Sequence, residues 1–262
     1  MIGSRDSPIR KLLARLFGSA GSMLRESAPG ACPVCARSVR GASAATLGLC
    51  PACAAAIPWI AAVRCATCGR GDSCPDCGRR ERTHFVQSRS AVRYDEAMRH
   101  LLARYKYRGD EALLALFARM LRKPYEAHIS SPQLQGGFDC ITYVPLSAGR
   151  LEERGFNQAE QMASALGMSV GVPVLPLLLR VRHTDKQSFK SRRERLADLS
   201  GAFAVDGCGM AELAATLADN RRRRVRVAVV DDVYTTGSTL NECAAVLERT
   251  LDADVYGITW AR

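Results

Sequence analysis

The sequence predicts an α/β fold, a parallel sheet with helices on both faces, preceded by a small cysteine-rich module. Residues 227–230 are four consecutive apolar residues, as in a strand buried on both faces of a parallel sheet, and a polar turn and an apparent helix over 240–251 follow them. Four C-x-x-C pairs lie within residues 32–77. We therefore expect a basic, flexible leader over 1–31, a metal-binding module over 32–82 and an α/β domain over 83–262.

The composition limits the classes of protein to which the chain can belong. The chain has 262 residues, 47% of them hydrophobic, which is enough for one domain of usual size and a small module. Its formal net charge of +11 favours polyanionic partners, although each basic cluster is also compatible with a solvated surface. No apolar run approaches about 18 residues and no secretory signal is evident, so we expect a cytoplasmic protein without a membrane span.

The leader is basic and rich in small residues. Its stretch 9–17 has the pattern of a short amphipathic helix, with glycine, serine and proline around it. Such a helix can contact a membrane surface or a partner. A frayed segment is the alternative, and the composition favours it.

The four C-x-x-C pairs predict two structural zinc sites. Two sulfurs three residues apart in a tight turn reach one ion, and a second pair closes the tetrahedral site. Pairing of neighbours in sequence is the simpler scheme, and interleaved pairing is the alternative. A redox role is the competing interpretation, but four pairs without an adjacent βαβ pattern favour metal. The predicted ligands are Cys32, Cys35, Cys50, Cys53, Cys65, Cys68, Cys74 and Cys77.

The next elements lead to a second polar feature. We expect a strand over 85–94, helices over 96–106 and 111–127, and a strand over 141–145. Residues 146–158 then read as a loop. The guanidinium groups of Arg150 and Arg154 suit the oxygens of a pyrophosphate. Asn157 either contacts the ligand or caps the helix expected to begin at Gln158.

The most informative feature is the end of the apolar strand, where Asp231 and Asp232 stand. Ligands of parallel sheets bind at this end of a strand. The two carboxylates can accept hydrogen bonds from vicinal ribose hydroxyls or approach Mg²⁺. The N–H groups and hydroxyls of the next loop can converge on a phosphate at a positive helix end. A buried strand ending in a polar turn is the alternative. The loop comprises Thr235, Thr236, Gly237, Ser238 and Thr239.

The run V-V-D-D-V-Y-T-T-G-S-T resembles the phosphoribosyl pyrophosphate binding motif of type I phosphoribosyltransferases. The resemblance implies that Asp231 and Asp232 bind the ribose hydroxyls and that the T-T-G-S-T loop holds the 5-phosphate, with Mg²⁺ on the ligand. Purine-salvage members carry an aspartate proposed as a base where this chain has Thr235. No general base is therefore visible in the loop.

The whole order of motifs resembles the ComF/GntX family over about residues 32–262. The motifs are the cysteine head, Y-V-P-L, R-G-F-N-Q, Q-S-F-K-S-R-R-E-R-L and D-D-V-Y-T-T-G-S-T. The resemblance implies a double zinc ribbon fused to a type I phosphoribosyltransferase-like domain, and a link to natural competence, the handling of incoming single-stranded DNA. The chain departs from the expected pattern at 183–187, H-T-D-K-Q, where we expect small or hydroxylic residues.

Three functions fit these features. The first is a phosphoribosyltransferase of unknown acceptor that supports DNA uptake. The second is a protein that binds single-stranded DNA through zinc ribbons and basic surface, including the run 221–224, although an aromatic content of only 6% weakens base stacking. The third is a scaffold whose zinc module docks a competence helicase or a recombination loader.

Overall fold

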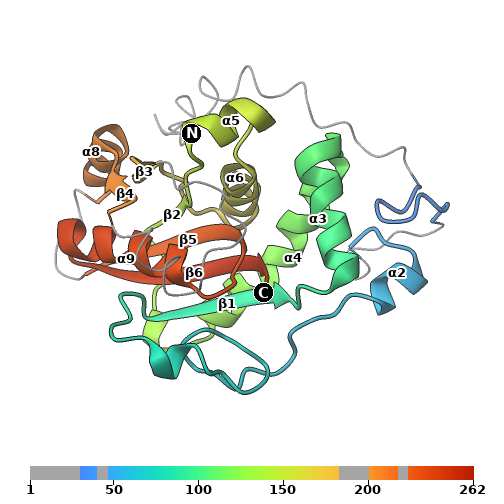
Figure 1. Ribbon diagram of the computed structural model, residues 1–262, viewed down its shortest axis with the longest axis horizontal. Coiled ribbons are helices and arrows are strands. Elements are labelled where there is room, and N and C mark those ends of the chain that lie inside the picture. Colours follow the sequence, from blue (N-terminus) through green and yellow to red (C-terminus); the bar gives the residue numbers. More distant parts are fainter. Residues whose placement is uncertain (1–29, 40–46, 183–200, 218–223) are drawn as a thin grey trace, which may run out of the picture.

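The computed structural model describes residues 30–39, 47–182, 201–217 and 224–262 (Figure 1). Most of the predicted leader, the basic segment 183–200 and residues 221–223 lie outside these ranges. The predicted α/β class is confirmed within them. Four strands form one parallel sheet in the order β1-β6-β5-β2. The strands are β1 Gln87–Val92, β2 Cys140–Tyr143, β5 Val225–Val233 and β6 Ala253–Ala261.

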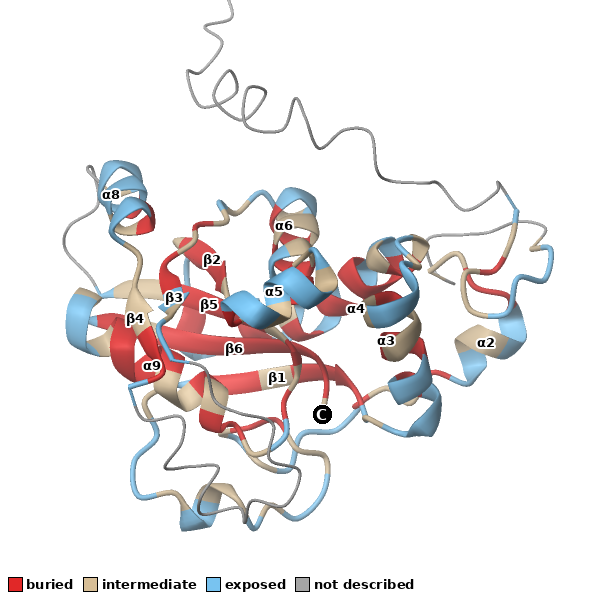
Figure 2. Cartoon of the chain, turned by 45° about the horizontal axis from the view of Figure 1, so that its top comes forward, coloured by how far each residue is buried: buried red, intermediate tan, exposed pale blue. Residues whose placement is uncertain are grey.

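Helices cover both faces of this sheet, and β5 shows why its sequence is continuously apolar. Ala228 and Val230 join the core beneath α4 Ala112–Ile129 and α6 Gln158–Val170. Val227 and Val229 point the other way, into the core beneath α9 Ser238–Leu251. All four side chains are fully buried, as expected where both faces are covered (Figure 2).

The remaining elements are helix α3 Glu96–Arg108, a small antiparallel pair of strands and several short helices. Helix α3 begins at Asp95, whose side chain accepts a hydrogen bond from the N–H of Met98. Strands β3 Leu178–Arg180 and β4 Phe203–Val205 form a separate antiparallel pair, and α8 Gly207–Thr216 follows β4. The shorter helices are α2 Pro51–Ala55, η2 Cys77–Arg79 and η3 Pro132–Leu134.

One expectation for this region was wrong. Residues 148–154, predicted as part of a loop, form the short helix α5 Ala148–Arg154. Gly155 follows it with a positive φ of 75°, the left-handed conformation that ends a helix. The helix has only seven residues, no side-chain cap and a glycine at its second position, so its sequence carries little helical signal.

The two cysteine segments pack on different parts of the α/β domain. In the first segment, Cys32 and Leu49 join the core beside α3 and α4, and the Arg104 guanidinium donates to the carbonyl of Val34 at 2.8 Å. In the second, the carbonyl of Thr67 accepts from the N–H of Ser88 in β1 at 2.7 Å. Across the described ranges, none of the helices combines the length and apolarity needed to cross a bilayer.

Candidate functional site

The acid pair ends the central strand β5. The N–H of Asp232 donates to Asp231 Oδ1 at 2.9 Å, and the Asp232 carboxylate forms an ion pair with Lys106 Nζ. This pair is largely buried, with 15% of the Lys106 side chain and 10% of the Asp232 side chain exposed. Lys106 lies in the last turn of α3, so the packing of α3 delivers an ammonium group to the end of the sheet.

The pKa values of the two carboxyls shift in opposite directions because their surroundings differ. Burial, reinforced by the charge of Asp232, raises the pKa of Asp231 well above its usual range. Burial also opposes ionisation of Asp232, but the Lys106 ammonium outweighs it and lowers the pKa of that carboxyl. A proton is therefore held more readily on Asp231 than on Asp232, whose carboxylate is paired with Lys106.

The T-T-G-S-T loop joins β5 to α9 and lines a small cleft. Thr235, Gly237 and Thr239 face this cleft together with Asp231 and Thr259 of β6. Gly237 has a φ of 77° and stands at the N-terminus of the 14-residue helix α9. The cleft thus places a carboxyl group, loop hydroxyls and a positive helix end side by side, which suits a phosphorylated sugar.

The remaining two loop residues bond to each other. Thr236 Oγ1 and Ser238 Oγ are 2.7 Å apart, and the N–H of Ser238 donates to Thr236 Oγ1 at 3.4 Å. Their hydroxyls stabilise the turn from which the helix starts. Neither residue is among those that line the cleft in this ligand-free structure.

The predicted arginines Arg150 and Arg154 lie on α5. Arg154 donates to Tyr107 Oη at 3.0 Å and to Gln158 Oε1 at 2.9 Å, so it is linked to the end of α3 that carries Lys106. Arg150 acts electrostatically on Arg180 of β3. Burial and the charge of Arg150 lower the pKa of Arg180, and the carboxyl of Asp231 opposes them. Arg180 is therefore within electrostatic reach of both Arg150 and Asp231.

Asn157 has a structural role in this state. Its Oδ1 accepts from the N–H of Ala159 at 3.0 Å, which caps α6, and its Nδ2 donates to the carbonyl of Val144 at 3.1 Å. The side chain is 6% exposed and both ends of its amide have partners. Asn157 thus ties the start of α6 to the end of β2.

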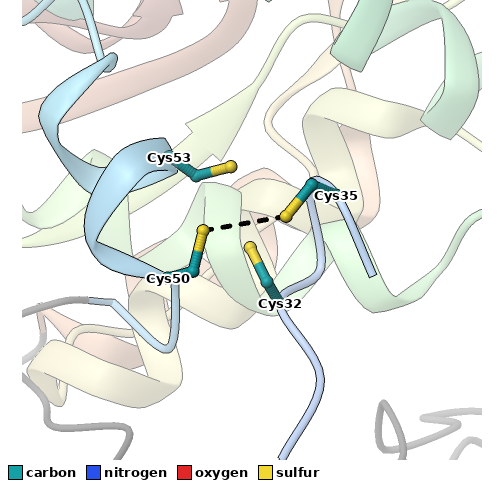
Figure 3. Close-up of side chains that lie close together, drawn as sticks. All are labelled: Cys32, Cys35, Cys50 and Cys53. Carbon is teal, nitrogen blue, oxygen red and sulfur yellow. Dashed lines mark hydrogen bonds between the residues drawn. The ribbon is translucent and has the colours of Figure 1, made fainter. Parts of the chain in front are cut away.

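The eight predicted cysteines form two tetrads, each made of pairs that are neighbours in sequence. Figure 3 shows the first, Cys32, Cys35, Cys50 and Cys53. Within each tetrad all sulfurs lie within 4.8 Å of one another, with 3.7 Å between Cys35 and Cys50 and 3.5 Å between Cys68 and Cys74. A tetrahedral zinc site with Zn–S bonds of about 2.3 Å places its sulfurs about 3.8 Å apart. The donor set and spacing fit zinc, and sequential pairing is confirmed over interleaved pairing.

Each tetrad holds at least one thiol of lowered pKa. Burial opposes ionisation of Cys32 and Cys74, but hydrogen bonds from nearby backbone N–H groups outweigh it and lower the pKa of each thiol to about 6. Burial raises the pKa of Cys53 and Cys77. Each site therefore contains a thiol that is ionised at neutral pH and ready to bind a cation.

Known proteins resemble this chain over most of its length, although no protein-family model matches it. It is 30% identical over 211 residues to "Competence protein ComFC" of Bacillus subtilis, and these residues cover 73% of this chain and 78% of that protein. It is 32% identical over 225 residues to "DNA utilization protein YhgH" of Salmonella typhimurium, covering 84% and 85%. The chain belongs to the ComF family. "Competence protein F" of Haemophilus influenzae is 32% identical over 157 residues, which cover 60% of this ComF-family chain and 64% of that protein.

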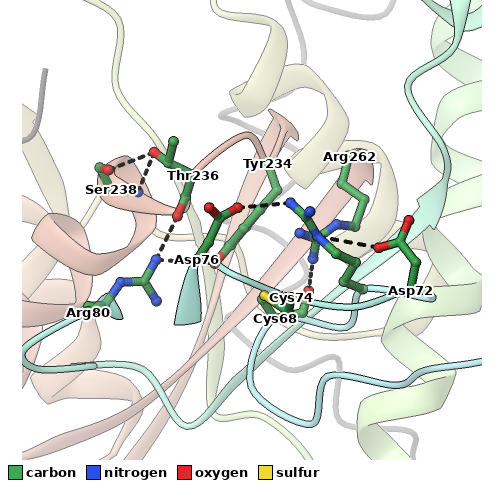
Figure 4. A network of polar contacts seen from close by, with 10 residues as sticks. Cys68, Asp72, Cys74, Asp76, Arg80, Tyr234, Thr236, Ser238 and Arg262 are labelled. Atoms are coloured by element: carbon green, nitrogen blue, oxygen red, sulfur yellow. Dashed lines mark hydrogen bonds and ion pairs between the residues drawn. The ribbon is translucent and has the colours of Figure 1, made fainter. Parts of the chain in front are cut away.

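The structure also adds residues to the site of this ComF-family chain that no sequence motif indicated. Arg80, three residues after Cys77, donates to the carbonyl of Thr236 at 2.6 Å (Figure 4). The guanidinium of Arg262 lies 4.7 Å from the ring centre of Tyr234 and donates to the carbonyl of Cys68. Like Lys106, these residues are far in sequence from the acid pair, and only tertiary packing brings them there.

Proposed function

We propose that this ComF-family chain binds phosphoribosyl pyrophosphate together with Mg²⁺ at the junction of β5 and α9. Asp231 and Asp232 would bind the ribose hydroxyls, and the loop 235–239 would hold the 5-phosphate. One observation carries the proposal: an acid-pair carboxyl and the loop line one cleft at the N-terminus of a long helix.

The acid pair suits vicinal hydroxyls because its two members differ. Asp231, whose pKa is raised, donates a hydrogen bond to a ribose oxygen when it is protonated, and Asp232, whose pKa is lowered, can accept from a hydroxyl. A carboxylate offers about four acceptor positions, so Asp232 can bind a hydroxyl while Lys106 stays in place. Mg²⁺ would enter with the ligand and neutralise its pyrophosphate.

The reaction that this site would support is transfer of the phosphoribosyl group to an acceptor of unknown identity. Arg150 and Arg154 lie on α5, and their guanidinium groups would stabilise the charge on departing pyrophosphate. Nitrogen attack at C1 of the ribose requires no protein nucleophile, so the absence of a base in the loop is compatible with this chemistry. Because its relatives are named for competence and DNA utilization, we infer that the activity supports DNA uptake in the cytoplasm.

A second candidate function is non-catalytic binding of single-stranded DNA, or docking of a helicase or recombination loader on the zinc module. The net charge of +11 favours the DNA version. Affinity for single-stranded DNA would then fall steeply with added salt and survive Asp231→Asn/Asp232→Asn. Docking would give a complex that also survives these changes.

The test is isothermal titration of phosphoribosyl pyrophosphate, with and without Mg²⁺, into the zinc-loaded chain. The proposal predicts Mg²⁺-dependent binding that Asp231→Asn/Asp232→Asn abolishes. Glu152→Gln/Glu153→Gln is the matched control, because it removes two carboxylates from exposed positions on neighbouring α5. Absence of binding to the wild type, or equal loss in both double variants, would contradict the proposal.

A further inference from the structure

The second cysteine module contacts the phosphate loop directly. Arg80 Nη2 donates to the carbonyl of Thr236 at 2.6 Å and lies 3.5 Å from Tyr234 Oη (Figure 4). The chain from Cys77 to Arg80 is short, since η2 Cys77–Arg79 begins at the last cysteine of the tetrad and Arg80 is its C-cap residue. The position of Arg80 therefore depends on the position of Cys77.

Further contacts hold the same segment on α9. The Asn241 side chain accepts from the N–H of His84 at 2.9 Å and donates to the carbonyl of Arg82 at 3.2 Å. His84 also pairs with Glu248 at 2.6 Å. The module is thus attached to the helix whose N-terminus forms the phosphate site, and it cannot shift without moving Arg80.

The hydrogen bond from Arg80 determines how the loop presents its backbone. In a planar trans peptide the C=O and the following N–H point in opposite directions. Because the Thr236 carbonyl faces Arg80, the N–H of Gly237 points away from it, and Gly237 lines the cleft. A flipped peptide would turn a carbonyl oxygen toward a bound phosphate, and the two would repel each other.

Arg80 also adds positive charge beside the loop. Its Nη1 is buried and has no hydrogen-bond partner, and no carboxylate pairs with its guanidinium among the described residues. The Arg262 guanidinium lies over the ring of the neighbouring Tyr234. It also donates a hydrogen bond to the carbonyl of Cys68, a predicted metal ligand of the second tetrad. Two links therefore connect the second tetrad to the turn at Tyr234–Gly237.

We propose that Arg80 is a positioning residue of the phosphate loop, and that the second cysteine tetrad, by holding Arg80, makes the loop conformation dependent on bound metal. The loop then presents the Gly237 N–H to an anion only when the second module is folded. The first tetrad has no such role, because its segment packs on α3 and α4 instead. The effect on ligand affinity rests on the proposed function, whereas the effect on the loop does not.

Hydrogen exchange of the loop amides, measured by mass spectrometry on the full zinc-loaded chain, tests the positioning role without any ligand. We expect faster exchange over residues 236–239 in Arg80→Ala and in Cys74→Ser. Matched controls are Arg79→Ala, an exposed neighbouring arginine, and Cys35→Ser in the first tetrad, and both should leave the loop unchanged. Arg80→Lys keeps one charged donor and should restore slow exchange in part.

Two outcomes would overturn the inference. One is a wild-type rate of hydrogen exchange in the loop of an Arg80→Ala variant that retains two zinc ions per chain. The other is equal loop exchange in Cys74→Ser and Cys35→Ser. Titration of phosphoribosyl pyrophosphate with Mg²⁺ should give a dissociation constant about tenfold higher in Arg80→Ala, as for loss of one charge-assisted hydrogen bond. If the wild type binds no such ligand, the proposed function is wrong, and hydrogen exchange still decides the role of Arg80.

Discussion

The ion pair between Lys106 and Asp232 is the most consequential single contact of the site. Its members are largely buried, so removing one leaves an uncompensated charge away from water. We expect Lys106→Met to lower the free energy of unfolding by about 3 kcal/mol. Adding Asp232→Asn should recover most of this loss, because neither charge then remains buried.

Urea denaturation of the two single variants and the double variant measures this coupling. Arg122→Met is the matched control, since Arg122 pairs with Glu126 on the surface of α4 with about half of each side chain exposed. It should cost less than about 1 kcal/mol. Additive losses in Lys106→Met and Asp232→Asn would show that the pair is not coupled.

His128 gives the fold a predictable dependence on pH. Its Nε2–H donates to the carbonyl of Gly257 at 2.9 Å, and its Nδ1 accepts from Gln87 at 3.2 Å. Burial lowers its pKa to about 4. Between about pH 4 and 6.5 the unfolded chain binds a proton here and the folded protein does not, so stability falls as pH falls through this window.

The expected loss from His128 alone is about 3 kcal/mol between pH 6.5 and 4. His128→Gln has no proton to bind, so its free energy of unfolding should fall less over the same range. Urea denaturation at several pH values measures the difference between the two proteins. Parallel curves would mean that the imidazole is protonated in the folded state.

At the scale of elements, the turn from β5 into α9 depends on the missing side chain of Gly237. A Cβ there would lie 2.0 Å from Tyr234 Oη and 2.8 Å from Arg80 Nη2, in addition to the strain of a φ of 77°. Gly171 is the matched position, with a φ of 71° and no atom within 4 Å of such a Cβ. The two glycines thus differ in packing and not in backbone conformation.

We expect Gly171→Ala to cost about 1 kcal/mol, the strain of the left-handed conformation. Gly237→Ala should cost about 1–3 kcal/mol more, because overpacking adds to that strain. Thermal and urea unfolding of the two variants compare these costs. Equal losses would show that Tyr234 and Arg80 move aside freely and that the turn is not tightly packed.

How far the sequence predicts an element depends on how local its causes are. The strand at 227–230 and the polar turn before α9 were predictable because burial on two faces demands a continuous apolar run and the turn that follows is rich in hydroxyl residues and glycine. The helix start at Gln158 and its Asn157 cap were equally local. Helix α5 was missed because its few residues are held mainly by what surrounds them.

The site residues divide in the same way. The acid pair can be recognised in the sequence because its two residues are adjacent. The cysteine tetrads can be recognised because the cysteines of each C-x-x-C pair are three residues apart. Lys106 and Arg80 reach the site only through the packing of α3 and of the second cysteine module, and no spacing in the sequence records those contacts. A basic residue beside aromatic residues, as in Y-K-Y-R-G-D, was the only available signal for Lys106.

At the scale of the whole molecule, the two tetrads predict two metal ions per chain. Metal analysis of the purified protein should give two zinc ions, and Cys50→Ser should reduce the content to one. Cys208→Ser is the control, because Cys208 is an exposed thiol outside both tetrads. Loss of both ions from Cys50→Ser would mean that the two sites are not independent.

The central claim is that the end of β5 and the loop before α9 form a phosphoribosyl site. A crystal structure of the zinc-loaded chain grown with phosphoribosyl pyrophosphate and Mg²⁺ tests it most directly. We predict density for the 5-phosphate against residues 235–239 and for the ribose hydroxyls against Asp231 and Asp232. Ligand bound elsewhere on the chain, with the cleft at this junction empty, would contradict the account.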